Sequence, residues 1–219
     1  MAVEIGKILD AIRSGRWQTQ VEEVRAAFAT GGKDAATPFK KSLPAMTPSR
    51  RFNGPHRADA LVEHSGLLCL DLDDLGDQLT GVRVKLADDP HCFALFTSPT
   101  GFGLKFLMKI PQAPAGHGAA FDFAADYFKR TYDLDADPAC RDVCRLCFVS
   151  YDSELVHRPD AQHFTFTPAH DPAGAYEWAD AVNVPGHLKN EHGQAYSRAA
   201  LDGEAARVAS APQARATPP

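Results

Sequence analysis

The sequence lacks a long apolar run and a secretory leader. No stretch approaches the roughly 18 consecutive apolar residues of a transmembrane helix. Met1–Lys7 contains no basic region followed by an apolar one, so we expect no secretory signal. The five cysteines are an odd number in a chain of 219 residues, which favours reduced thiols. These features predict a cytoplasmic protein without a membrane segment.

An excess of basic residues is missing as well. The net charge is −5, so the chain as a whole does not carry the positive charge typical of nucleic-acid-binding proteins. Any contact with nucleic acid must therefore depend on a local basic patch. The apolar fraction of 44% supports a substantial core, and 23% charged residues is ordinary for a globular protein.

Apolar periodicity divides the chain into three parts. Residues 1–36 have helical spacing and predict a helical flank of two helices, the second ending at Gly31-Gly32. Residues 37–170 contain the strand patterns and predict the functional core. Residues 171–219 lose the pattern and, being rich in alanine and proline towards the end, predict a partly disordered linker or tail.

Residues 37–57 are both basic and rich in proline. Four prolines argue against a long regular element, and no acidic residue separates the cations. The segment predicts a positive loop that contacts the phosphates of a nucleic acid; the alternative is a solvated surface loop. The cations proposed to bind nucleic acid are Lys40, Lys41, Arg50 and Arg51.

A strand over Gly66–Asp74 ends in paired carboxylates. Because side chains alternate along a strand, Leu68, Leu70 and Leu72 face the core while Asp71 and Asp73 lie together on the other face. Two like charges at this spacing repel each other and resist desolvation. Mg²⁺ or Mn²⁺, which prefer oxygen ligands, would remove both problems. The alternative is an acidic turn in solvent.

A hairpin is predicted after that strand. Short helices are expected over residues 58–64 and 78–87, and residues 91–98 and 102–110 form the two strands. Alternation places Phe102 with the core side chains and Lys105 on the opposite face, near Asp71 if the strands are neighbours.

The turn of this hairpin has a second possible role. Glycines at Gly101 and Gly103 let backbone amides approach a ligand, and Lys105 can meet a phosphate. The alternative is a simple turn.

A third polar group follows a helix predicted over residues 120–132. Arg145 lies between apolar residues in a strand predicted over Val143–Ser150, and a buried arginine needs an anionic partner. Asp137 and Asp142 precede it. The group is either an internal salt bridge or a third metal-binding carboxylate beside a phosphate-binding guanidinium. A last strand is predicted over residues 163–167.

The spacing of Cys140, Cys144 and Cys147 matches an iron–sulfur motif. We reject that interpretation because Cys144 and Cys147 fall on opposite faces of a predicted strand. A zinc site with His157 is a weaker alternative. Free buried thiols are favoured.

The order of these motifs resembles the archaeo-eukaryotic primase (primase–polymerase) superfamily. The closest likeness is to the VirE-type N-terminal domains of phage and mobile-element replication proteins. It rests on Leu70-Asp71-Leu72-Asp73, Ser98-Pro-Thr-Gly-Phe-Gly-Leu-Lys105 and Arg145-Leu-Cys-Phe-Val-Ser-Tyr-Asp152. Many relatives have a Ser-x-His motif, and this chain has Lys105 at that place.

The resemblance implies an α+β fold: an RRM-like antiparallel sheet with helices on one face, an open catalytic face and an N-terminal αβ flank. It implies a DNA primase or DNA polymerase, a nucleotidyltransferase acting in DNA replication with nucleoside triphosphates and single-stranded DNA, alongside a replicative helicase. The implied catalytic and metal-binding residues are Asp71, Asp73 and Asp137. The implied nucleotide-binding residues are Ser98, Gly101, Gly103, Lys105 and Arg145.

Two alternatives remain at this point. An RRM-like sheet can bind nucleotides or single strands without chemistry. The same carboxylates could also serve a metal-dependent phosphoesterase.

Overall fold

A computed structural model describes residues 4–52, 61–111, 116–165, 169–170 and 176–177. The chain divides into two compact units, Met1–Thr165 and Phe166–Pro219. In the second unit, β9 (Ala169–His170) pairs antiparallel with β10 (Tyr176–Glu177). The remainder of the tail predicted over residues 171–219 lies outside the described residues.

A four-stranded antiparallel sheet forms the centre of the first unit. Its strands are β4 (Leu67–Leu72), β6 (Leu104–Lys109), β5 (Ala94–Thr97) and β8 (Val156–His157), in that spatial order. The strand and the hairpin predicted from the sequence are confirmed as β4 and β5–β6. Asp71 pairs directly with Lys105 across β4 and β6, so the two side chains share a face.

One face of the sheet packs against α3 (Leu79–Ala87), which follows the 3₁₀ turn η2 (Gly76–Gln78), and α4 (His117–Tyr132). The β4 leucines at positions 68, 70 and 72 are fully buried here. Phe106 of β6 meets Phe128 of α4 edge to face, with 4.8 Å between ring centroids. Both helices agree with the sequence prediction.

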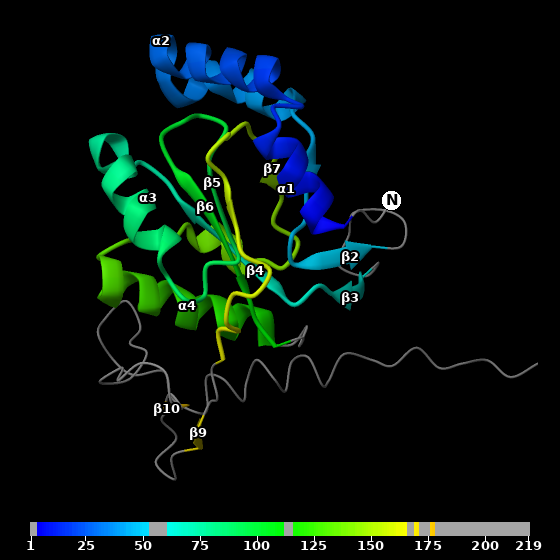
Figure 1. The fold of residues 1–219 in the computed structure, drawn as a ribbon, viewed down its shortest axis with the longest axis vertical. Helices are drawn as coiled ribbons and strands as arrows, with labels where there is room; N and C mark the ends of the chain where they lie inside the picture. Colours follow the sequence, from blue (N-terminus) through cyan, green and yellow to red (C-terminus); the bar gives the residue numbers. More distant parts are fainter. Residues whose placement is uncertain (1–3, 53–60, 112–115, 166–168, 171–175, 178–219) are drawn as a thin grey trace, which may run out of the picture. The chain divides into compact units, whose positions relative to one another are not determined.

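The opposite face is also covered. In Figure 1, α1 (Ile5–Arg13) lies beside the strands on the side away from α3, and α2 (Gln18–Ser42) lies above the upper ends of β5 and β6. Apolar side chains of the two helices form one buried cluster with sheet residues that share the Lys105 face. The helices contribute Leu9, Ile12, Val21 and Val24, and the sheet contributes Leu67, Ala94, Phe96 and Leu107. The mixed α+β fold with small antiparallel sheets is confirmed, and the expectation of helices on one face with an open sheet face is wrong.

Helix α2 extends further than the sequence suggested. Its backbone leaves helical geometry at Gly31 and Gly32 and then resumes, so the predicted end is a kink. The helix continues through Pro38 to Ser42, where a positive loop was predicted, and places Lys40 and Lys41 in its last turn. It therefore crosses the boundary expected at residue 36.

Three predicted elements differ from the structure. Residues 61–64 form β3 (Leu61–His64), paired with β2 (Arg50–Phe52), and not the end of a helix; residues 58–60 and Arg57 lie outside the described residues. Only Cys147–Phe148 of the strand predicted at 143–150 is extended, as β7, paired with β1 (Ala45–Met46). The last predicted strand reduces, in its described part, to one bridge between His163 and Lys109.

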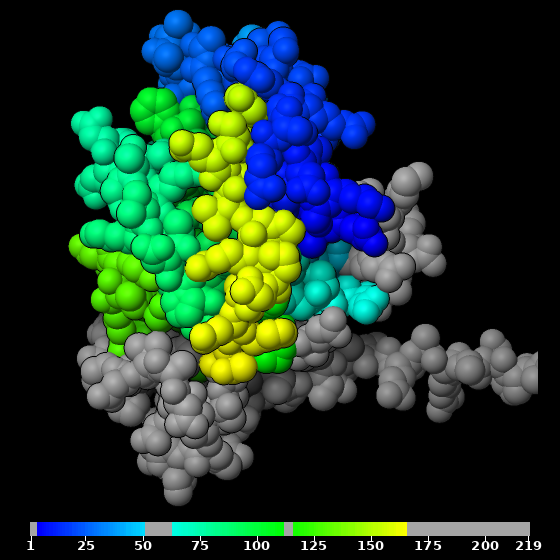
Figure 2. Space-filling view, viewed as in Figure 1, coloured from blue at the N-terminus to red at the C-terminus, as the bar shows by residue number. Residues whose placement is uncertain are grey.

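The loop after β7 fastens the two layers together. Arg13 of α1 donates to the Leu155 carbonyl at 3.1 and 3.3 Å. Arg83 of α3 donates to the Asp152 carboxylate at 2.7 and 3.2 Å. Figure 2 shows this stretch as a yellow ridge between the blue α1 and the blue-green α3. Among the described residues, none of the helices has the length and apolar character needed to cross a bilayer.

The close approach of the 98–105 turn to β4 makes Gly103 necessary. A Cβ at Gly103 would lie 2.6 Å from the Leu72 carbonyl oxygen, whereas one at Gly81 of α3 would meet nothing within 4 Å. We expect Gly103→Ala to lower the free energy of unfolding by ~1–3 kcal/mol. Gly81→Ala should raise it by ~0.5–1 kcal/mol because glycine is unfavourable inside a helix. Urea unfolding of both variants measures the difference, and equal effects would contradict the assigned contact.

Candidate active site

A buried ion pair lies at the centre of the candidate site. Asp71 Oδ2 pairs with Lys105 Nζ, and each residue is only 5% exposed. The other carboxylate oxygen, Oδ1, is buried with no hydrogen-bond partner among the described residues. The sequence expectation that a lysine lies beside the strand carboxylate is met. The unpartnered oxygen leaves a costly unsatisfied acceptor facing the site.

Asp137 reaches Asp71 from a distant part of the chain. Its backbone N–H donates to the Asp71 carbonyl at 2.8 Å. As N-cap of the 3₁₀ turn η4 (Pro138–Arg141), it accepts from the Ala139 N–H at 2.9 Å through Oδ1. Oδ2 accepts from Arg145 Nη2 at 2.9 Å. The arginine predicted to need an anion is thus paired with Asp137, on a turn and not in a strand.

Asp142, the rival carboxylate, makes a different contact. Its Oδ1 accepts from the Cys144 N–H at 2.8 Å, which closes the turn that leads to Arg145. Asp142 also lines, with Ser49 and Asp71, a small cavity that is described below. Its local geometry matches that of Asp137, but it makes no described contact with Asp71.

Asp73 directly follows β4, and the residue is exposed. Partial burial raises the pKa of its carboxyl, and the nearby Asp137 charge raises it further, while Lys40 and Lys33 oppose the shift. Burial, together with the charges of Lys105 and Arg145, lowers the pKa of Lys40, while Asp73 raises it. One end of the sheet therefore gathers three carboxylates and four cations that interact with one another. The carboxylates are Asp71, Asp73 and Asp137, and the cations are Lys33, Lys40, Lys105 and Arg145.

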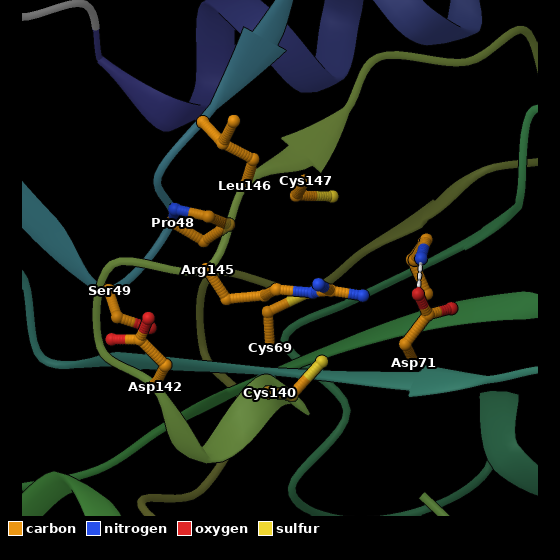
Figure 3. A pocket seen from close by; sticks show the side chains of 10 residues that line it. Pro48, Ser49, Cys69, Asp71, Cys140, Asp142, Arg145, Leu146 and Cys147 are labelled. Carbon is orange, nitrogen blue, oxygen red and sulfur yellow. Dashed lines mark ion pairs between the residues drawn. The ribbon is translucent and has the colours of Figure 1, made fainter. Parts of the chain in front are cut away.

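A small cavity opens at this point (Figure 3). Arg145 extends across it towards Asp71, and the Cys140 side chain points into the space between them. The room for water-sized contents is about 10 Å³, which suits a single water molecule. Any larger ligand must bind at the mouth, where nearly half of the Arg145 side chain is exposed.

The 98–105 turn is used differently from the expectation. The Ser98 N–H donates to the Gly103 carbonyl at 2.8 Å, and the Gly101 N–H donates to the Ser98 carbonyl at 3.0 Å. Gly101 has a φ of +84°, which favours glycine. The Gly101 amide, which was expected to meet phosphate, is therefore already bonded within the turn, while Gly103 lies against the Asp73 backbone.

The basic segment contributes less than expected. Arg50 is 6% exposed and donates to the Cys144 thiol, so the prediction that it offers a charge to nucleic acid is wrong. Lys41 is exposed on α2, and Lys40 lies 5.7 Å above the Phe148 ring. The Arg51 side chain lies outside what the structure describes.

All five cysteines are free thiols. Cys69, Cys140 and Cys147 line the cavity, whereas Cys144 lies with Arg50. The strand on which the iron–sulfur motif was rejected is not formed at Cys144, which lies in a turn before β7. The described part of the chain holds one group of three potential ligands with donor atoms within 4.8 Å of one another: Asp71, Asp137 and Cys140. Asp73 and His157 fall outside this group.

Two residues escaped the sequence analysis. Cys140 was considered only with the other cysteines, and its signal was its place three residues after Asp137. Lys33 was not considered at all. Its spacing of seven residues from Lys40, two helical turns, was the available signal that both lie on one side of α2. Phe102 was considered, but its assignment to the core is wrong, because the residue is 44% exposed.

Two buried histidines hold η4 against the sheet. The Gly66 N–H donates to His64 Nδ1 at 3.0 Å, so the neutral ring carries its proton on Nε2. That nitrogen lies 3.1 Å from His117 Nδ1, and His117 Nε2 lies 3.4 Å from the Cys140 carbonyl. The chain of donors requires both rings to be neutral. Burial, then the neighbouring His64, lowers the pKa of His117 to about 4.

The matched family covers this whole arrangement. Residues 38–157 match the family model described as BT4734-like, N-terminal domain. The chain belongs to the BT4734-like N-terminal domain family. No curated protein and no solved structure matches the chain. Every predicted site residue falls inside the matched range, whereas α1 and most of α2, which cover the sheet face, precede it.

The histidine pair predicts a loss of stability in acid. Because the folded pKa of His117 lies below its ordinary value of 6.5, its stabilisation is complete above that pH and is lost as the pH falls towards 4. The slope from this group is at most about 1.4 kcal/mol per pH unit. We expect His117→Gln to flatten the pH dependence of urea unfolding measured with EDTA present. The exposed His163→Gln should retain the wild-type slope, and an equal change in both variants would contradict the assignment.

For Asp73 we expect a pH dependence of stability with the opposite sign. Its folded pKa is raised, so the folded state disfavours its charge, and stability falls as the pH rises above the ordinary value of 3.8. The Asp73→Asn variant should therefore unfold at a higher urea concentration than the wild type at neutral pH. The advantage should vanish in acid below that value. Asp77→Asn, in η2, serves as the control and should change neither measurement.

Proposed function

We propose that this BT4734-like domain is a metal-dependent nucleotidyltransferase of the primase–polymerase type. It would join nucleoside triphosphates on a single-stranded DNA template during replication of a phage or mobile element. The proposal rests on the convergence of Asp71 and Asp137 in backbone contact, with Lys105 and Arg145 each paired to one of these carboxylates. Opposite charges gathered from separate segments at a cavity mouth suit phosphate chemistry.

The carboxylates offer a place for a divalent cation. Asp71 has a buried oxygen without a partner, and an oxygen of Asp137 lies within 4.8 Å of an Asp71 oxygen. Asp71 and Asp137 would hold the cation, with Asp73 at the rim. When bound, Mg²⁺ or Mn²⁺ would lower the pKa of an attacking 3′-hydroxyl and offset the charge of a triphosphate.

The cations of the chain would position the phosphates. The cavity is too small for a phosphate group, so the triphosphate would lie at the mouth, against Arg145 and Lys40. Arg145 uses one terminal nitrogen for Asp137, and the planar guanidinium has further N–H donors for phosphate oxygens. Lys105, beneath them, would keep Asp71 charged. Lys41 on the same helical turn would contact the template backbone.

The buried Asp71–Lys105 pair favours a second candidate function. A lysine already bound to the central carboxylate balances the charge of the site without any metal ion. In that case the domain would bind nucleotides or single strands through Lys40 and Arg145 without catalysis. Binding unaffected by EDTA and an absence of incorporation would support this candidate.

A matched pair of variants tests the catalytic proposal. Asp137 and Asp142 each accept from a backbone N–H two residues later, at 2.9 and 2.8 Å, and asparagine can keep that bond. Incorporation of labelled triphosphates on a single-stranded template should fall about 100-fold or more in Asp137→Asn, because a carboxylate that would hold the divalent cation is lost. Asp142→Asn should stay within about threefold of wild type, since its carboxylate closes a turn and lies outside the group of potential metal ligands, although it borders the cavity.

The design separates the competing outcomes. Substitution at Asp71 would leave Lys105 buried without its partner and so disturb the fold, which makes Asp137 the better position. Equal activity of the two variants would overturn the assigned role of Asp137. Shortened template in place of extended primer would indicate a phosphoesterase.

A further inference from the structure

The metal-ligand group contains a thiol as well as two carboxylates. Asp71 is the next-to-last residue of β4, Asp137 caps η4, and Cys140 lies one turn further along η4. One donor atom from each lies within 4.8 Å of the other two, and Cys140 is 4% exposed. Asp73, which the sequence pattern paired with Asp71, is not a member.

Both carboxylates keep capacity for a further ligand. Asp71 pairs with Lys105 through Oδ2, while Oδ1 is buried and unpartnered in a residue 5% exposed. A buried acceptor without a partner is destabilising, and a cation would remove that cost. Each Asp137 oxygen accepts one described hydrogen bond and retains a second lone pair.

We propose that Asp71, Asp137 and Cys140 form a mixed oxygen–sulfur site that prefers a divalent cation of the zinc or cobalt(II) class over Mg²⁺. This inference deepens the function proposed above and concerns the same site. Mg²⁺ takes oxygen ligands and dehydrates reluctantly, whereas thiolate ligands select softer transition metals. The cavity is lined by two further thiols, Cys69 and Cys147, whose sulfur atoms add polarizable surroundings to its charged side chains.

Binding would release one proton. The Cys140 S–H bond breaks, the proton passes to solvent, and a sulfur–metal bond forms, with no oxidation or reduction. Because the Cys140 side chain is buried and burial disfavours a free thiolate, the thiolate forms together with the cation.

Cobalt(II) provides a probe that does not depend on activity. The full chain, stripped with EDTA, then freed of chelator and kept reduced, is titrated with Co²⁺. We expect the thiolate-to-cobalt charge-transfer absorption in the near ultraviolet to rise and level off at one equivalent. Zn²⁺ should abolish the band at equal concentration, while a large excess of Mg²⁺ should leave it.

Three variants assign the sulfur. Cys140→Ser should lose the band and bind Co²⁺ about tenfold or more weakly, by calorimetry. Cys144→Ser, four residues away and outside the group, should keep it. Cys69→Ser should also keep the band, since this thiol borders the cavity but is not in the ligand group. Asp137→Asn provides a second disruption if Cys140→Ser does not fold.

Each outcome decides the proposal. Absence of the band in wild type, its survival in Cys140→Ser, or its displacement by Mg²⁺ would overturn the mixed site. A cysteine-dependent band without nucleotide incorporation would support the site and refute the proposed function. Incorporation with Mg²⁺ but no cobalt band would support the proposed function and refute the mixed site.

Discussion

The pairing of Asp71 with Lys105 constrains everything around it. Two charges buried to this degree are tolerated only when each satisfies the other, so β4 and β6 must keep the register that places them opposite each other. That register also fixes which leucines face α4. Asp137, bonded to the Asp71 backbone, and the turn carrying Arg145 then take their positions from the same strand end.

The charged core of the site follows from the sequence because its causes are local. Alternation along β4 and β6 and a tight hairpin bring Asp71 and Lys105 to one face without information from the rest of the chain. The sequence also predicted an anionic partner for Arg145, and Asp137 supplies it, although the arginine lies half exposed on a turn and not in the predicted apolar strand. These inferences use rules that hold over a few residues.

What the sequence could not supply depends on tertiary contacts. Helical periodicity identifies an amphipathic N-terminus, but it does not say that α1 and α2 cover the second face of the sheet. An alternating pattern at 143–150 looks like a strand, yet only two of its residues find a partner, in β1. Arg50 seemed exposed because it is basic, but the Cys144 thiol accepts its hydrogen bond in the interior.

The ridge formed by residues 151–155 connects the helices on the two faces of the sheet. Arg13 reaches it from one face of the sheet and Arg83 from the other, so both helices are hydrogen-bonded to a single loop. Neither helical layer can slide over the sheet without breaking bonds to the same few backbone and carboxylate oxygens. Shear between the layers is thereby suppressed, and the strand ends that carry the charged cluster are kept at a fixed spacing.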